Sequence, residues 1–412
     1  MTLLGVTGYC LCAFLPSYLT DRSERIEYEK ALLHQERLKN QAQQGSAQAL
    51  YELGQIALSR RGYERARRYF EQAAEQKHVD ATFYVGASYI HGWGGPVLPD
   101  KGIDFLMFAA DHQQPQAFLE LGLLYGTGDI VPIDYQKSYS FMLKAAENNI
   151  PEAQYNLGNF YFHGYQNDIN YEQAFEWYSK AADQGMSMAC NQVGYMLNAG
   201  IGVEKNTSKA LYFFEKAAQQ HNVLALNNLG IIYATGVDVD LDYEKAKHYF
   251  YCAAKAGHAS SQYYLAELYM KGLGRPVDVK HALEWYKKAA SQDYDQALTM
   301  LGILYAQGFG VDLNYEKAKD YFLQAALHNN PQAQNNLGLL YVSSKGVDLD
   351  YKVAYEWFLK AAQQSYPEAE YNLGLLYEKG LGVDQDLHQS SLWYQRAKEH
   401  AVDKKPDSEQ SQ

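Results

Sequence analysis

The sequence contains few cysteines, few prolines and few basic residues, and two of these scarcities exclude a class of protein. The four cysteines among 412 residues are too few and too scattered for a disulfide framework: Cys10, Cys12, Cys190 and Cys252. Lys and Arg total 36 against 48 Asp and Glu, and the resulting net charge of −12 argues against a nucleic-acid-binding face. A mean hydropathy of −0.43 excludes a polytopic membrane protein. The ten prolines contrast with 37 tyrosines, an excess that an internal repeat explains.

The first nineteen residues lack charged side chains altogether. No Lys or Arg precedes the apolar stretch and no A-x-A site follows it, as a secretory signal would need. Gly and Pro interrupt the segment, which is too short for a stable membrane span. We interpret residues 1–20 as an apolar N-terminal segment and keep three hypotheses open: a degenerate export signal, a weak anchor or an ordinary flap. The first of these favours an exported, periplasmic location over a cytoplasmic one.

An internal repeat of 36 residues organises the chain. The nonapeptide AQNNLGLLY at 333–341 is nearly duplicated by ALNNLGIIY at 225–233, 108 residues earlier. The glycine of this motif recurs in steps of 36 at positions 86, 122, 158, 194, 230, 302, 338 and 374, with Ala266 in the series and Gly54 before it. Ala-Ala pairs keep the same step from 73 to 361. We therefore predict ten repeats over residues 47–398.

Each repeat is predicted to fold as two helices. In the first helix a small residue, a Leu or Val and a Tyr share one face, as Ala153, Leu157 and Tyr161 do. The glycine inside this helix costs about 1 kcal/mol relative to alanine, so we expect the second helix to approach it closely. Paired aromatic residues in the second helix, such as Trp177-Tyr178, are predicted to pack in the core. An Asp or Asn predicts the N-cap of the second helix in eight repeats, at Asp134, Asn170, Asn206, Asp242, Asp278, Asn314, Asp350 and Asp386.

The pattern A-x-x-x-[LV]-G-x-x-Y-x-x-G-x-G-V-x-x-D-x-x-K-A-x-x-W-[YF]-x-K-A-A resembles the Sel-1-like repeat, a relative of the tetratricopeptide repeat. The resemblance covers residues 47–398 and implies an all-α fold. It implies a right-handed α/α superhelix, or solenoid, of about ten 36-residue helix-pair repeats whose first helices line a concave face. Because the end of a solenoid needs a cap, residues 21–46, with YEKA at 28–31, are predicted as an N-terminal capping helix. Residues 399–412 are predicted as a disordered polar tail.

The resemblance places two positions of each first helix on the concave face, three residues before the glycine and one residue after it. These positions carry aromatic and amide side chains with few charges, which suits a peptide-binding groove. A competing interpretation is that they only shield the inner side of the array. The second position also holds Leu339. The predicted partner-binding residues are Tyr51, Phe83, Leu119, Tyr155, Asn159, Asn191, Tyr195, Asn227, Tyr263, Glu267, Asn335 and Tyr371.

Candidate metal and catalytic motifs are weak. Asp238, Asp240 and Asp242 alternate as at the start of a calcium loop, but a tyrosine stands where that loop needs glycine. His248 and Cys252 share a helix face, yet two ligands do not make a zinc site. No catalytic motif such as G-x-S-x-G or a P-loop is present, so we expect no catalytic residue, metal or cofactor.

We therefore expect a non-enzymatic scaffold or adaptor that binds a protein or peptide and is itself a monomer. The resemblance implies roles in bacterial envelope maintenance, signalling or host interaction. One alternative is a cell-wall or polysaccharide-binding solenoid. Another is a hydrolase similar to the β-lactamase-like cysteine-rich relatives, whose paired cysteines this chain lacks.

Overall fold

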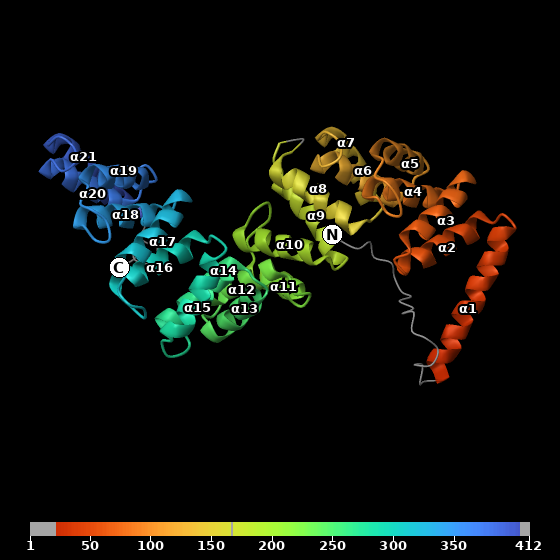
Figure 1. Cartoon of the computed structure of the whole chain (residues 1–412), viewed down its shortest axis with the longest axis horizontal. Helices are drawn as coiled ribbons and strands as arrows, with labels where there is room; N and C mark the ends of the chain where they lie inside the picture. The colour runs from red at the N-terminus through yellow and green to blue at the C-terminus, as the bar shows by residue number, and fades with distance from the viewer. Residues whose placement is uncertain (1–21, 166–167, 404–412) are drawn as a thin grey trace. The chain divides into compact units, whose positions relative to one another are not determined.

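The chain is described by a computed structural model over residues 22–165 and 168–403. The apolar segment 1–20 and the tail from residue 404 onward lie outside the described residues. Over the described ranges the chain forms 21 α-helices and no β-strand (Figure 1). The predicted all-α fold is therefore confirmed.

The helices fall into two compact units, one ending at Asn206 and one beginning at Thr207. The first unit contains α1 (Arg22–Gln43), α2 (Ala47–Ser59), α3 (Tyr63–Glu75), α4 (Val79–His91), α5 (Pro99–Asp111), α6 (Pro115–Thr127), α7 (Tyr135–Glu147), α8 (Pro151–His163), α9 (Tyr171–Asp183) and α10 (Ser187–Ala199). The second unit contains α11 (Thr207–Ala218), α12 (Val223–Thr235), α13 (Tyr243–Lys255), α14 (Ala259–Lys271), α15 (Val279–Ala290), α16 (Asp295–Gln307), α17 (Tyr315–Leu327), α18 (Pro331–Ser343), α19 (Tyr351–Ala362), α20 (Pro367–Lys379) and α21 (Leu387–Asp403).

Within each unit the helices pack in chain order, as a solenoid requires. The first helices of the ten repeats are the even-numbered helices α2 to α20, and the second helices are the odd-numbered helices α3 to α21. Inside a unit each helix packs mainly against its neighbours in the chain, and neighbouring first helices also touch, as α12 and α14 do. The hydrophobic core is continuous across repeats, because one cluster of buried residues extends from α13 to α18. The predicted solenoid of about ten helix pairs is confirmed.

The glycine of the first helix lies directly against a large side chain of the second helix. A β-carbon added to Gly230 would lie 2.5 Å from the Phe250 ring, and one added to Gly338 would lie 2.6 Å from the Phe358 ring. Real β-carbons do not approach other atoms so closely, so the glycine makes room for the ring. This confirms the expected close approach of the two helices and explains why these two positions carry glycine rather than alanine, a better helix former.

Side-chain caps start the second helices where the sequence predicts them. The Asp242 carboxylate accepts a hydrogen bond from the Lys245 backbone N–H at 2.9 Å, and the Asn314 side chain accepts one from Lys317 N–H at 2.9 Å. These bonds satisfy N–H groups that have no partner inside the helix. They also hold the pKa of Asp242 below its ordinary value. The same cap is confirmed at Asp134, Asn170, Asp278, Asp350 and Asp386.

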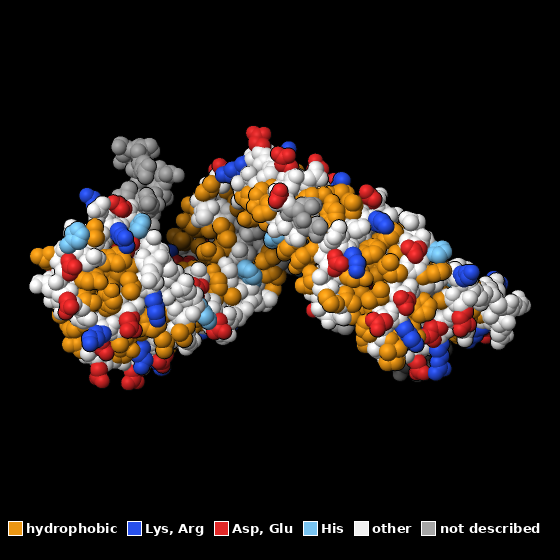
Figure 2. Space-filling model, turned by 90° about the horizontal axis from the view of Figure 1, so that it is seen from above, with side chains coloured by type: hydrophobic (Ala, Val, Ile, Leu, Met, Phe, Trp, Pro, Cys, Tyr) orange, Lys and Arg blue, Asp and Glu red, His pale blue; other side chains and the backbone are white. Residues whose placement is uncertain are grey.

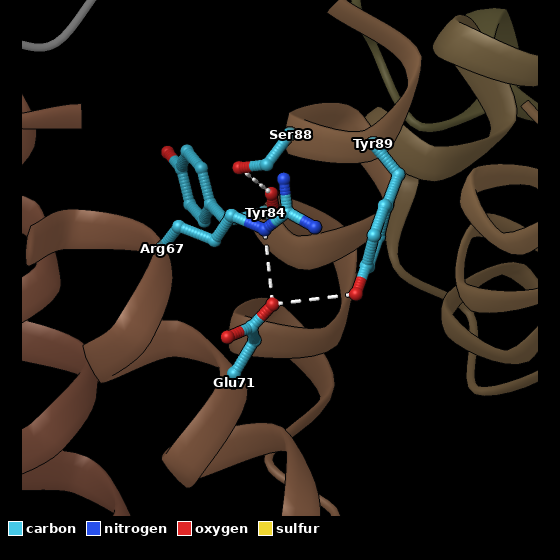
Figure 3. Close-up of polar contacts among 5 residues, drawn as sticks. All are labelled: Arg67, Glu71, Tyr84, Ser88 and Tyr89. Carbon is cyan, nitrogen blue, oxygen red and sulfur yellow. Dashed lines mark hydrogen bonds and ion pairs between the residues drawn. The ribbon is translucent and has the colours of Figure 1, made fainter. Parts of the chain in front are cut away.

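In several repeats the tyrosine three residues after the glycine contacts the second helix of the repeat before it. In Figure 3 the Arg67 side chain of α3 reaches Tyr89 of α4, and its guanidinium carbon lies 3.8 Å from the ring centroid. Glu71 accepts hydrogen bonds from Arg67 Nε at 2.9 Å and from the Tyr89 hydroxyl at 3.4 Å. Two repeats later the hydroxyls of Tyr139 and Tyr161 lie 2.7 Å apart. These tyrosines therefore serve contacts between repeats.

The two outermost helices differ from the inner ones. Helix α1 packs against α2 through the buried side chain of Leu38, within the segment 21–46 predicted as a cap. Helix α21 has 17 residues where α19 has 12, and it runs to Asp403 rather than ending near residue 398 as expected. Its last turn is held by His400, whose Nδ1 lies 2.8 Å from Oε1 of the buried Glu370. None of the helices in residues 22–165 and 168–403 combines the length and the apolar character needed to cross a bilayer.

Candidate functional site

The twelve residues predicted to bind a partner all lie on first helices, but they differ in exposure. Five are buried, so they offer little surface to a partner: Phe83, Leu119, Asn191, Asn227 and Asn335. Five are half-buried: Tyr51, Tyr155, Asn159, Tyr263 and Glu267. Only Tyr195 of the first unit and Tyr371 of the second unit are exposed. The surface available to a partner is therefore smaller than the sequence pattern indicates.

Two of the buried asparagines connect neighbouring first helices. Asn227 Oδ1 on α12 accepts a hydrogen bond from Ser261 Oγ on α14 at 2.8 Å. Asn335 Oδ1 on α18 accepts one from Asn372 Nδ2 on α20 at 2.8 Å. A buried amide needs such partners, and these bonds fix the register of successive repeats. The amides thus stabilise the array at positions that the sequence assigned to a partner.

Two half-buried residues hold the tyrosine rings of the second helices. Asn159 Oδ1 accepts a hydrogen bond from the hydroxyl of the buried Tyr178 at 2.7 Å. Glu267 accepts one from Tyr286 and pairs with Lys271 Nζ at 2.5 Å. Burial, and the hydrogen bond to Glu267, raise the pKa of Tyr286 far above its ordinary value, so this tyrosine stays protonated. These polar groups therefore already have partners within their own repeat.

The exposed predicted residues of the second unit meet in a cleft formed by α18, α20 and α21. The cleft has a volume of about 830 Å³. Leu339 of α18 is 41 % exposed and Tyr371 of α20 is 52 % exposed, so both can contact another molecule. We call this site the C-terminal cleft; it is lined by Asn335, Leu339, Pro367, Glu368, Tyr371, Asn372, Tyr394, Ala397, Lys398 and Ala401.

The aromatic side chains of the C-terminal cleft are held in place by α20 and α21. The rings of Tyr371 and Tyr394 pack with centroids 5.2 Å apart and planes at 45°. The Tyr394 hydroxyl donates to Glu378 Oε2 at 2.7 Å. Burial and this hydrogen bond raise the pKa of Tyr394 to about 12, so the ring is neutral at physiological pH. The cleft therefore offers a fixed, largely apolar wall.

The sequence pattern missed the contribution of α21 to this cleft. Tyr394, Ala397 and Lys398 lie 36 residues after Phe358, Ala361 and Ala362, which are buried in the cluster that α19 forms with α20. In α21 the second alanine of the pair is replaced by the exposed Lys398. The missing Ala-Ala pair at 397–398 was therefore the sequence signal that this face of α21 differs from the others.

A second cleft of about 650 Å³ lies between α1 and α2 in the first unit. Its walls are mostly polar, and none of the predicted partner-binding residues lines it. Near it His78 stacks on Tyr51 with ring centroids 4.8 Å apart and contacts Gln48 through Nε2 at 3.0 Å. Burial raises the pKa of Tyr51 to about 12. Exposed Leu and Tyr side chains converge in the C-terminal cleft and not in this one.

The weak metal motifs belong to α13 and to the loop before it. Asp242 caps α13 and therefore has a structural role. His248 Nε2 and Cys252 Sγ lie 4.0 Å apart on α13. Across the described part of the chain, no three His, Cys, Asp or Glu side chains are placed to hold a metal ion together.

Comparison of the chain with family models identifies one matching family. The family model described as Sel1 repeat matches ten successive segments: residues 41–78, 79–112, 115–150, 151–186, 187–222, 223–258, 259–294, 295–330, 331–366 and 367–401. A search of the curated proteins finds no match.

Two solved structures resemble the chain over most of its length. A protective antigen of uropathogenic Escherichia coli with an SLR fold is 30 % identical, covers 91 % of each chain and superposes with a TM-score of 0.63. A Sel1 repeat protein from Oxalobacter formigenes is also 30 % identical, covers 75 % of this chain and 88 % of its own, and has a TM-score of 0.57.

Proposed function

Because this chain belongs to the Sel1 repeat family, we propose that it is a non-enzymatic scaffold that binds a partner protein in the C-terminal cleft. Solenoids of this family generally serve protein–protein interaction, and the chain consists almost entirely of such repeats. The proposal adds the place of binding. It assigns the first contact to Leu339 and Tyr371.

The observation that supports this proposal is the convergence of two exposed apolar side chains in one cleft. Leu339 and Tyr371 come from successive first helices, and the Tyr394 ring packs against the Tyr371 ring. Rigid tyrosines beside a concave apolar surface are typical centres of protein interfaces, because they bury area with little loss of side-chain freedom. A groove between helices accepts the apolar face of a partner helix. The cleft therefore favours a helical segment with one or two large apolar side chains.

The tryptophans of the second helices favour a protein partner over a polysaccharide. Sugar rings stack on open aromatic faces, and in this chain a lysine covers the face of several tryptophans. Lys180 Nζ lies 3.6 Å from the ring centroid of Trp177 on α9. Lys360 Nζ lies 4.0 Å from that of Trp357 on α19. The cation occupies the face of the ring on which a sugar would stack.

A paired substitution in the C-terminal cleft tests the proposal. The variant L339S/Y371S removes the two exposed contacts, whereas L224S/Y212S removes a leucine and a tyrosine of similar exposure elsewhere in the second unit. Wild type and both variants would be used to capture partners from the native cells, and affinities would then be measured with each purified partner. The cleft variant should bind at least about tenfold more weakly, since truncating a central contact costs more than about 1 kcal/mol at each residue. The control variant should bind like wild type.

Far-ultraviolet circular dichroism of all three proteins establishes that the helices are intact. If every captured partner binds the cleft variant and the wild type equally well, the C-terminal cleft is not the binding site. If the control variant loses binding to the same extent, the effect is not specific to the cleft, and the proposal also fails.

A further inference from the structure

An exposed aliphatic side chain precedes the second helix in four successive loops of the second unit. These residues are Leu241, Val277, Leu313 and Leu349, and each is 52 to 55 % exposed. We call the surface that they form the loop edge. Figure 2 shows one face of the molecule on which hydrophobic side chains gather in patches, with acidic side chains among them. These aliphatic residues recur every 36 residues with nearly equal exposed fractions, unlike apolar residues that are scattered singly over a surface.

The loops that carry the loop edge follow one another in space. A β-carbon on Gly346, in the loop before α19, would lie 2.7 Å from the backbone of Tyr315, the first residue of α17. A β-carbon on Gly310, in the loop before α17, would likewise lie against Val279, the first residue of α15. Each loop thus rests on the start of the second helix in the preceding repeat. The four aliphatic side chains therefore belong to one continuous edge.

The loops do not need aliphatic side chains to close. Leu313 covers Gly308, which has φ +67°, and a β-carbon on this glycine would lie 3.2 Å from Leu313 Cβ. In the last loop Gln385 covers Gly380, which has φ +64°, at the same 3.2 Å. Because glutamine closes the turn with its own β-carbon, the part of Leu241 and Leu313 beyond the β-carbon is not needed in the turn, whereas at Val277 a γ-methyl also lies against Gly272. The exposed part of these side chains is free for another contact.

Acidic residues flank the loop edge. Asp240, Asp312 and Asp348 each precede an aliphatic residue and are exposed. The four loops contain two basic side chains, and both have neighbours: Arg275 Nε lies 3.3 Å from Glu244, and Lys345 Nζ lies 5.4 Å from the ring centroid of Tyr315. The edge therefore combines apolar contacts with a net negative charge in its loops. Such a surface favours an apolar partner with positive charges.

We propose that the loop edge binds a polypeptide segment of a partner protein in which apolar residues alternate with Lys or Arg. The apolar residues contact Leu241, Val277, Leu313 and Leu349, and the basic residues pair with the aspartates between them. This surface shares no residue with the C-terminal cleft. It gives the scaffold a second place to hold a protein, with a different chemistry.

The experiment measures binding of a fluorescein-labelled peptide of alternating leucine and lysine to the full chain by fluorescence anisotropy. The variant L241S/V277S/L313S/L349S should bind at least about tenfold more weakly, because four apolar contacts are lost. The variant D240N/D312N/D348N should bind more weakly at low salt and like wild type at high salt. The matched control is V97S/I133S/I169S, which removes equally exposed aliphatic residues at the same repeat position in the first unit, where one aspartate, Asp168, precedes them instead of three. This control should retain the wild-type affinity.

Three results would overturn the proposal. The quadruple serine variant could bind as tightly as wild type. A peptide of alternating serine and lysine could bind as tightly as the leucine peptide, which would reduce the interaction to charge alone. Light scattering could show that the quadruple variant changes the oligomeric mass of the protein, in which case the edge is an interface between copies of this chain.

Discussion

Replacing Gly230 by alanine should destabilise the sixth repeat, although alanine is the better helix former. The new β-carbon would lie 2.5 Å from Cδ1 and Cε1 of Phe250, far inside the contact distance of about 3.5 to 4.0 Å. The ring has little freedom to move, since Phe250 is buried and stacks on Tyr264 with centroids 5.3 Å apart. Overpacking of this kind costs about 1–3 kcal/mol, and alanine returns about 1 kcal/mol of helix propensity. The expected net loss is about 1 kcal/mol.

Hydrogen exchange of the amides in α12 and α13 is the suitable assay, because long repeat arrays do not unfold in one cooperative step. A loss of about 1 kcal/mol should speed exchange in these helices about fivefold and leave distant repeats unchanged. The double variant G230A/F250L should lose less than the sum of the two single variants, since leucine makes room for the new β-carbon. Ala266 offers the opposite control: A266G should destabilise the seventh repeat through helix propensity. Unchanged or slower exchange in G230A would refute the close approach of the two helices.

Two further predictions concern caps and a buried pair. Backbone hydrogen bonds lower the pKa of Asp134, Asp242 and Asp278, so their stabilisation is complete above the ordinary value of 3.8 and is lost as the pH falls through the lowered values. At acid pH the amide exchange rate in α13 should therefore depend less on pH in D242N than in wild type. The exchange rate in α17 should depend more on pH in N314D than in wild type. Identical pH profiles in the variants and the wild type would contradict the caps. H400A should destabilise α21 by about 1–3 kcal/mol in the same assay, because Glu370 is buried and would lose its partner. The double variant E370Q/H400A should recover part of this loss, and equal exchange in H400A and wild type would show that the pair is not needed.

The elements that could be predicted from the sequence are those set by local contacts within a repeat. Gly230 predicts the approach of Phe250 because both positions recur together every 36 residues. Asp242 and Asn314 predict helix starts because an N-cap needs only the next three residues. Ten copies of the same signals made the register unambiguous.

The exposure of the candidate site could not be predicted in the same way. Asn227 and Asn335 occupy positions expected to face a partner, yet they are buried because Ser261 and Asn372 of the next repeat bond to them. The burial of these asparagines depends on which side chain the neighbouring repeat supplies, and the periodic pattern does not predict that side chain. The C-terminal cleft could not be predicted either, because it combines residues of α18, α20 and α21, and α21 differs from the other second helices. Exposed aliphatic residues before the N-caps were visible in the sequence, but their exposure became apparent only in the folded chain.

The packing of each helix mainly on its sequence neighbours has a consequence for how the gene can change. Equivalent positions recur every 36 residues, so a deletion or duplication of 36 codons rejoins the chain at a matching place wherever it occurs. The new junction repeats an interface that the protein already contains. The near-identity of residues 225–233 and 333–341 is what a duplicated block of three repeats would leave behind. Evolution can therefore vary the length of such a protein in whole repeats while it keeps the interfaces between them.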